Sequence, residues 1–226
     1  MCRWPSTSDP THALIASLRR QPLLLVIRPR DPLQLAPLLE QLQALGLLHV
    51  EIAWQASLPG WVEACRQLVE AFPALHLGAA SVCDAAGVEA AASAGLAYVV
   101  SPILSRRILE SGRSAGLAVV PGVMTPTEVE RARRWGSPIV KLFPAVGLGP
   151  DYWRRLRDPL GDPLPFCVAA GGLGPADVIP WLEAGVDAVV LGSALLNPGG
   201  TGADLEAGTA EPLRHLLAQL PHQRLH

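Results

Sequence analysis

The sequence of 226 residues has very little lysine. Of its 18 Lys and Arg residues, 17 are arginines, and the single lysine is Lys141. It lies in residues 138–144 (PIVKLFP), an apolar, β-branched run typical of a buried strand. Arginine stays protonated in proteins, whereas burial can lower the pKa of a lysine from about 10.4. Lys141 is therefore a candidate amine nucleophile, the alternative being a lysine that reaches solvent from a strand end.

Other absences exclude whole classes of protein. No apolar run approaches the roughly 18 residues of a membrane span, and the run at 23–27 is too short and too far into the chain for a secretory signal. The net charge of −2 gives no reason to expect nucleic acid. The cysteines form no CxxC motif, so we expect free thiols in a reducing cytoplasm; they are Cys2, Cys65, Cys83 and Cys167.

One unit repeats along the chain after a leading helix expected at residues 9–20. Strand-like runs begin at Leu23, His49, Leu75, Ala97, Ala118, Pro138, Pro165 and Ala188. Helical patterns follow them at 32–45, 58–72, 84–94, 105–114, 125–135, 151–158, 175–183 and 211–220, the last after a Gly- and Pro-rich connection at 197–209. This alternation predicts an α/β fold, a single (β/α)8 TIM barrel over residues 1–226 with an extra N-terminal helix and the barrel proper at 22–220.

A doubly wound open sheet is the alternative architecture. It is disfavoured because no G-x-G-x-x-G motif follows the first strand, where a dinucleotide site would need one.

In a barrel, chemistry is found at the carboxyl ends of the strands. The polar residues expected there are Arg28, Glu51, Gln55, Ser81, Ser101, Lys141 and Ser193. Strand alternation places Glu51 and Gln55 on one face of their strand, and Lys141 and Phe143 on one face of another. Because barrel interiors are normally apolar, an interior Glu51 and an interior Lys141 are expected to share one pocket.

The positions and spacing of the histidines argue against a metal site. His49 and His76 begin their strands, so they belong to the amino-terminal end of the barrel. No histidine pair has H-x-H or H-E-x-x-H spacing, and the strand ends offer one carboxylate. We therefore expect no metal and no diffusible cofactor.

Two glycine-containing turns indicate a phosphate site. Residues 169–175 (AAGGLGP), with Gly171 and Gly172, follow the seventh strand, and Gly192 and Ser193 end the eighth. Backbone N–H groups of such turns approach anions closely, and barrels often hold phosphate between these two loops. The alternative is a pair of tight turns that need glycine only for their geometry.

Taken in order, seven motifs resemble the KDPG/KHG aldolases, which act on 2-keto-3-deoxy-6-phosphogluconate (KDPG) and 4-hydroxy-2-oxoglutarate (KHG). The motifs are VEIAWQAS (50–57), GAASV (78–82), VVSP (99–102), VVPGVMTPTE (119–128), VKLFPA (140–145), AAGGL (169–173) and LGSALL (191–196). The resemblance implies a class I aldolase on a homotrimeric barrel. It implies Lys141 as the Schiff-base lysine, Glu51 as the general acid/base and Phe143 as a pocket wall. It also implies that Gly171, Gly172 and Ser193 hold the substrate phosphate. The further candidate substrate contacts are Gln55, Ser81, Ser101, Pro102 and Gly192.

The sequence departs from the commonest family pattern at two positions. Many members carry an arginine where this chain has Gln55, and a threonine where it has Ser81. That arginine helps to hold the substrate carboxylate. A branch that acts on 2-keto-3-deoxy-6-phosphogalactonate resembles this chain in having a short amide there and an arginine like Arg28 at the end of the first strand. The stretch GPDYWRRL (149–156) also resembles that branch, so Arg28 is expected to replace the missing guanidinium.

The sequence thus predicts a small phosphorylated keto acid as substrate. The expected reaction is cleavage of KDPG to pyruvate and glyceraldehyde 3-phosphate, with KHG as a further substrate. The galactonate epimer is the alternative substrate. A phosphosugar isomerase or synthase that forms no imine, and a non-catalytic phosphate-binding barrel, are the alternative functions.

Overall fold

The computed structural model describes residues 9–192 and 208–220, and within them nine parallel strands form one sheet. The strand order is β5-β4-β3-β2-β1-β9-β8-β7-β6. The strands are β1 (Leu23–Ile27), β2 (His49–Ala53), β3 (His76–Ala80), β4 (Tyr98–Val100), β5 (Ala118–Val120), β6 (Gly122–Val123), β7 (Ile139–Leu142), β8 (Phe166–Ala170) and β9 (Ala188–Leu191).

The first and last strands of this sheet belong to one continuous stretch of chain. β5 pairs with β4 and β6 pairs with β7, and only Pro121 separates the two segments. Proline has no N–H to donate, but the Pro121 carbonyl accepts a 2.8 Å hydrogen bond from the Lys141 N–H. Residues 118–123 therefore act as the predicted fifth strand and close the sheet. The α/β TIM-barrel prediction is confirmed.

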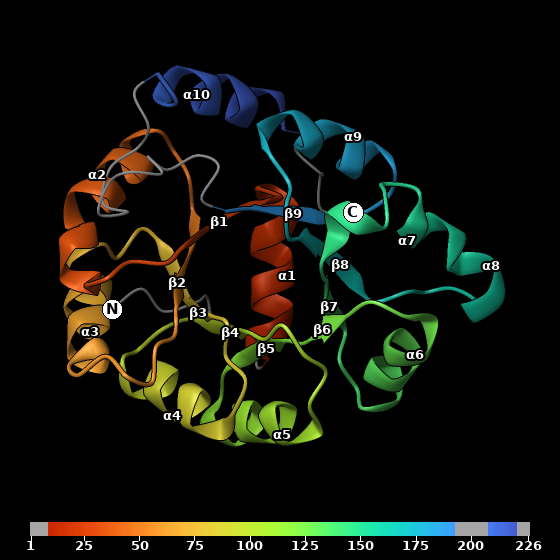
Figure 1. The fold of residues 1–226 in the computed structure, drawn as a ribbon, viewed down its shortest axis with the longest axis horizontal. Coiled ribbons are helices and arrows are strands. Elements are labelled where there is room, and N and C mark those ends of the chain that lie inside the picture. Colours follow the sequence, from red (N-terminus) through yellow and green to blue (C-terminus); the bar gives the residue numbers. More distant parts are fainter. Residues whose placement is uncertain (1–8, 193–207, 221–226) are drawn as a thin grey trace.

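Helices surround the barrel, as the ring in Figure 1 shows. They are α2 (Ala36–Ala44), α3 (Trp61–Ala71), α4 (Ala85–Ser93), α5 (Arg106–Ala115), α6 (Pro126–Arg134), α7 (Tyr152–Arg155), α8 (Arg157–Leu160), α9 (Val178–Glu183) and α10 (Ala210–Gln219).

Three of the helices predicted from the sequence differ in the structure. The one at 32–45 begins as a 3-10 turn, η1 (Pro32–Leu35), and the one at 175–183 as η3 (Pro175–Asp177); a further 3-10 turn, η2 (Ala145–Gly147), follows β7. The single helix predicted at 151–158 is two short ones, α7 and α8.

The core has two layers because strand side chains alternate. One layer packs the outer strand faces against the helices and includes Val140 and Leu142 of β7. The other fills the barrel interior with residues such as Ile139 and Val168. This alternation orients Lys141 toward the interior, on the same face of β7 as Ile139.

The predicted leading helix is α1 (Pro10–Arg20), which crosses the middle of the ring in Figure 1. Asp9 caps it, accepting from the Thr11 N–H at 2.8 Å. Its apolar face packs into the interior layer through Leu14, Ile15 and Leu18. The helix thereby covers the amino-terminal end of the barrel, opposite the end where Lys141 lies. None of the described helices is long and apolar enough to cross a membrane.

Candidate active site

Lys141 lies in β7 and is 6% exposed. Burial lowers the pKa of its ammonium group, the nearby Glu51 opposes that shift, and Arg28 adds to it. The Nζ atom lies 4.9 Å from the centre of the Phe143 ring, as a cation above an aromatic face. The one lysine of the chain is therefore held in surroundings that favour the neutral amine.

Glu51 lies in β2 and is 0% exposed. Burial raises the pKa of its carboxyl group to about 7, although Lys141 and Arg28 both oppose the rise. Neither carboxyl oxygen has a hydrogen-bond partner among the described residues. A carboxyl with a pKa near neutrality exchanges protons readily at physiological pH, which is what general acid/base chemistry needs.

Lys141 opens onto a cavity of about 410 Å³ at the carboxyl end of the barrel. Of the predicted site residues, Arg28, Phe143, Gly171, Gly172 and Gly192 line it with Lys141. Residues that the sequence analysis did not name complete the wall: Val26, Ala170, Leu173, Gly174 and Val190. Strand alternation could have predicted three of them. Each lies two positions before a predicted site residue and therefore on the same face: Val26 before Arg28, Ala170 before Gly172 and Val190 before Gly192.

Arg28 and Gln55 occupy different surroundings. Arg28 directly follows β1, lines the cavity, and interacts electrostatically with both Glu51 and Lys141. Gln55 does not line the cavity, and its Nε2 donates a 2.6 Å hydrogen bond to the Pro29 carbonyl oxygen. Gln55 thus binds the loop that presents Arg28.

The predicted serines at the strand ends differ in their local roles. Ser81 follows β3 with φ of 60°, the one described non-glycine residue with positive φ. Ser101 is buried, and its hydroxyl donates to the Ile103 carbonyl oxygen at 3.0 Å and accepts from the Ile103 N–H at 3.2 Å. Pro102 packs its carbonyl against Gly122, where a Cβ would lie 2.3 Å away. Ser101 and Pro102 shape the β4 turn outside the cavity lining, and their substrate contacts stay predictions.

The turn after β8 requires its two glycines. Gly171 and Gly172 have φ of 98° and 81°, a left-handed conformation that side chains disfavour. A Cβ on Gly171 would lie 2.8 Å from the Phe143 ring, and one on Gly172 would lie 2.5 Å from Val146. The turn therefore packs directly against the segment that follows Lys141. Ser193, predicted beside it, lies outside the described residues, as do residues 197–207 of the connection predicted at 197–209.

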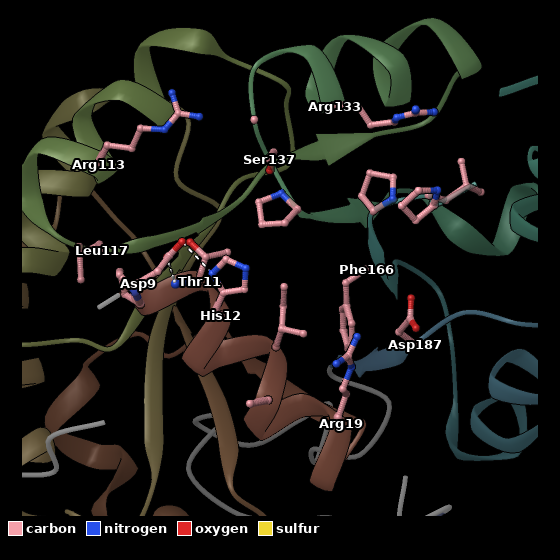
Figure 2. A pocket seen from close by; sticks show the side chains of 18 of the residues that line it. Asp9, Thr11, His12, Arg19, Arg113, Leu117, Arg133, Ser137, Phe166 and Asp187 are labelled. Atoms are coloured by element: carbon pink, nitrogen blue, oxygen red, sulfur yellow. Dashed lines mark hydrogen bonds and ion pairs between the residues drawn. The ribbon is translucent and has the colours of Figure 1, made fainter. Parts of the chain in front are cut away.

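A larger cavity of about 1220 Å³ lies at the opposite end of the barrel, beside α1 (Figure 2). Three of its arginines already have partners within the fold. Arg113 and Arg133 donate to backbone carbonyl oxygens, and Arg157 lies 3.8 Å from Asp162. Lys141 lines the smaller cavity and not this one, so the smaller cavity is the better candidate for the active site. Glu51 does not line either cavity, but it interacts electrostatically with Lys141 and Arg28 of the smaller one.

A family model for KDPG and KHG aldolases matches residues 14–205. The chain belongs to the KDPG/KHG aldolase family. It is accordingly an aldolase, and aldolases are lyases; the family acts on small phosphorylated substrates.

Two curated relatives of this KDPG/KHG aldolase differ in their named substrates. A 2-dehydro-3-deoxy-6-phosphogalactonate aldolase of Escherichia coli (strain K12) is 28% identical over 179 residues, 79% of this chain and 86% of that protein. A 2-dehydro-3-deoxy-phosphogluconate aldolase of Pseudomonas aeruginosa is 32% identical over 159 residues, 70% of each chain. A solved structure described as native KDPGal has a TM-score of 0.74 and 26% identity, and the match covers 88% of this chain and 97% of the other.

Proposed function

We propose that this family member is a class I aldolase that cleaves a 2-keto-3-deoxy-6-phospho-sugar acid through an imine on Lys141. The observation that carries the proposal is the pairing of two buried groups in one barrel interior. The pKa of the Lys141 ammonium is lowered and the pKa of the Glu51 carboxyl is raised, in each case mainly by burial. A nucleophile and a proton acceptor are thereby both prepared for work near neutral pH.

The proposed reaction begins when the neutral Lys141 amine attacks the C2 ketone. The resulting carbinolamine loses water to give a protonated imine. The ionised Glu51 takes the proton of the C4 hydroxyl as the C3–C4 bond breaks, and the bond electrons pass into the imine to form an enamine. Protonation of the enamine at C3 and hydrolysis of the imine release pyruvate. The other product is glyceraldehyde 3-phosphate.

The ends of the substrate are assigned to two rims of the cavity. We assign the phosphate to the turns carrying Gly171, Gly172 and Gly192, together with Ser193. The carboxylate is assigned to Arg28, which lines the cavity and can bind it with two hydrogen bonds. Ser81, which follows β3 and does not line the cavity, is assigned a further hydroxyl contact to the carboxylate.

The gluconate epimer, KDPG, is the first candidate substrate, and KHG is a further one. The placement of Arg28 and Gln55 favours a second candidate, the galactonate epimer, because Arg28 provides the cavity's guanidinium while Gln55 binds the Pro29 carbonyl. An assay of pyruvate release through a coupled dehydrogenase, run on both epimers and on KHG, decides between them. A higher kcat/KM for KDPG would eliminate the second candidate.

We also propose that the protein is a homotrimer of the cytoplasm. Three large apolar side chains, Ile103, Met124 and Val146, are exposed on loops at the carboxyl end of the barrel and provide contact surface for neighbouring subunits. Cys65, Cys83 and Cys167 are free thiols, as a reducing compartment requires. Sedimentation equilibrium tests the trimer.

Borohydride reduction in the presence of pyruvate tests the central step. The wild-type chain should acquire one label, on Lys141, because the sequence has one lysine. Lys141→Arg keeps the positive charge but cannot form the imine, so label and pyruvate release should both disappear. Label confined to the N-terminal amine, or activity that survives in the arginine variant, would overturn the proposal. A phosphosugar isomerase would turn over its substrate without trapping, and a non-catalytic barrel would bind phosphate ligands without releasing pyruvate.

A further inference from the structure

Tyr98 lies in β4, which is separated by β3 from β2, the strand that carries Glu51. Its phenol group lies inside the barrel. Its side chain is 0% exposed and belongs to the interior layer of the core. The three strands are in register, with Glu51 of β2 opposite Gly78 of β3, and Gly78 opposite Tyr98 of β4. Gly78, which has no side chain, is therefore the residue between Glu51 and Tyr98 in the register.

The tyrosine ring occupies the space above that glycine. A Cβ built on Gly78 would lie 2.5 Å from both Cε2 and Cζ of Tyr98, and 2.7 Å from Cδ2. The ring therefore leans from β4 across β3, with its far end over Gly78. The hydroxyl is bonded to Cζ, so it extends past Gly78 toward β2 and Glu51.

The Tyr98 hydroxyl and the Glu51 carboxyl group are complementary as hydrogen-bond donor and acceptor. The Tyr98 hydroxyl and both carboxyl oxygens of Glu51 are buried and have no hydrogen-bond partner among the described residues. A buried phenol normally finds an acceptor, and a buried carboxylate normally finds donors. The Tyr98 hydroxyl is thus a buried donor without an acceptor, and the Glu51 carboxylate is a buried acceptor without a donor.

We propose that Tyr98 is the positioning residue of Glu51: its hydroxyl donates a hydrogen bond to one water, which in turn donates to the carboxylate and holds Glu51 in its ionised, proton-accepting form. This inference rests on the proposed function, because it assigns Glu51 the role of proton acceptor. Neither Tyr98 nor Glu51 is among the residues that line the cavity, and the proposal gives Tyr98 no contact with the substrate: it acts only through Glu51.

Three groups act on the Glu51 charge. Lys141 of β7 and Arg28 after β1 are cations that favour the carboxylate. Tyr98 interacts with Glu51 from β4. Burial and, after it, the Glu51 carboxylate raise the pKa of the Tyr98 phenol well above its ordinary value, so the hydroxyl stays protonated and able to donate. Loss of the Tyr98 hydroxyl leaves both cations in place and removes only the donor.

Tyr98→Phe tests the proposal because it removes one oxygen and keeps the ring above Gly78. Without the donor the carboxylate is less stabilised, so the pKa of Glu51 should rise by about one unit. The acidic limb of the kcat profile should move to higher pH by the same amount. We expect kcat at neutral pH to fall about fivefold, KM to change less than about twofold, and borohydride trapping of pyruvate to persist.

Tyr152→Phe is the matched control, since Tyr152 is the other tyrosine of the sequence. Its hydroxyl donates to the Met124 carbonyl oxygen at 2.7 Å. The control should leave the acidic limb unmoved. An unchanged limb in Tyr98→Phe, or an equal shift in both variants, would overturn the proposal and leave the ring as core filling.

A second measurement separates this inference from the proposed function. The Glu51 carboxyl can be titrated by carbon NMR in protein labelled at the glutamate carboxyls, with its signal assigned by loss in Glu51→Gln. A higher Glu51 pKa in Tyr98→Phe supports the hydrogen bond even if the wild-type protein fails to trap pyruvate, a failure that would count against the proposed function alone. Identical titrations of wild type and variant overturn the role of Tyr98.

Discussion

At the scale of single residues, the proposed chemistry depends on how burial changes two pKa values in opposite directions. The pKa of Lys141 falls because an ammonium is poorly solvated in the interior, and the pKa of Glu51 rises for the same reason. Each charge also opposes the shift of the other, and Arg28 lowers both pKa values. A single apolar environment thus favours the uncharged form of both the nucleophile and the acid/base group.

Glu51→Gln should lower turnover about 10²–10⁴-fold, because the amide keeps the size of the side chain but cannot accept a proton. In the wild type, the pKa of about 7 places half of Glu51 in its protonated, inactive form at that pH. Below it, kcat should fall about tenfold per pH unit, as steady-state kinetics across pH 5–9 would show. Turnover within a few-fold of wild type in the glutamine variant would contradict the assigned role.

Arg28→Ala should raise the KM for the keto acid steeply, since the substrate carboxylate would lose its charged partner. Guanidinium added to the buffer should partly restore activity. Gln55→Ala is the companion variant and should have a smaller effect, through loss of the hydrogen bond to Pro29. Unchanged KM in Arg28→Ala together with lost pyruvate binding in Gln55→Ala would show that Gln55 is the carboxylate ligand.

At the scale of elements, the turn after β8, to which we assign the substrate phosphate, packs against the segment that follows Lys141. Gly172→Ala would place a Cβ 2.5 Å from Val146 Cγ1 at a φ of 81° and displace the backbone N–H groups. KM for phosphorylated substrates should rise about fivefold or more, and KM for unphosphorylated KHG should stay near its wild-type value. Parallel kinetics on the two substrate types checks this.

Gly185→Ala is the control for backbone strain. Gly185 also has a positive φ, of 100°, but it lies in the turn between α9 and β9 with open space around the Cβ position. Both variants should lose about 1 kcal/mol of stability from the left-handed conformation. Equal KM effects in the two variants would exclude a direct phosphate contact at the β8 turn.

At the scale of the whole molecule, α1 and the barrel meet at a buried histidine. His49 is 0% exposed, its Nε2 lies 2.9 Å from Ser17 Oγ of α1, and its ring stacks on His76 with centroids 5.3 Å apart. Burial, aided by His76 and Arg20, lowers the pKa of His49 from 6.5 to about 3. The histidine is therefore neutral in the folded protein over most of the acidic range.

This histidine should make the fold sensitive to acid. Between pH 6.5 and about 3 the unfolded chain binds a proton at His49 that the folded chain does not, so stability falls as pH falls. The contribution is about 1.4 kcal/mol per pH unit. Urea unfolding at pH 7 and pH 5 should show this loss in wild type and a smaller one in His49→Gln. His12→Gln, at an exposed position of α1, is the control and should match wild type.

The sequence alone determined the architecture and singled out Lys141 and Glu51 as the candidate catalytic residues. Eight apolar runs alternating with amphipathic segments favour a closed parallel sheet, because each strand must bury both faces. Lys141 and Glu51 stood out for a similar reason. A charge within an apolar strand costs free energy, and such a cost is found mainly where chemistry needs it.

Only the tertiary structure decided how side chains meet across strands. Pro121 divides the fifth strand, Gln55 turns to the Pro29 carbonyl, and the Ser101 hydroxyl is used within its own turn. In the sequence, Tyr98 is an ordinary residue of an apolar strand. The strand register of the folded barrel shows that it lies across Gly78 from Glu51. Such contacts depend on strand register and loop path, which join residues far apart in the chain. Local patterns determine which face a side chain occupies, and the packing of the whole barrel determines what it touches there.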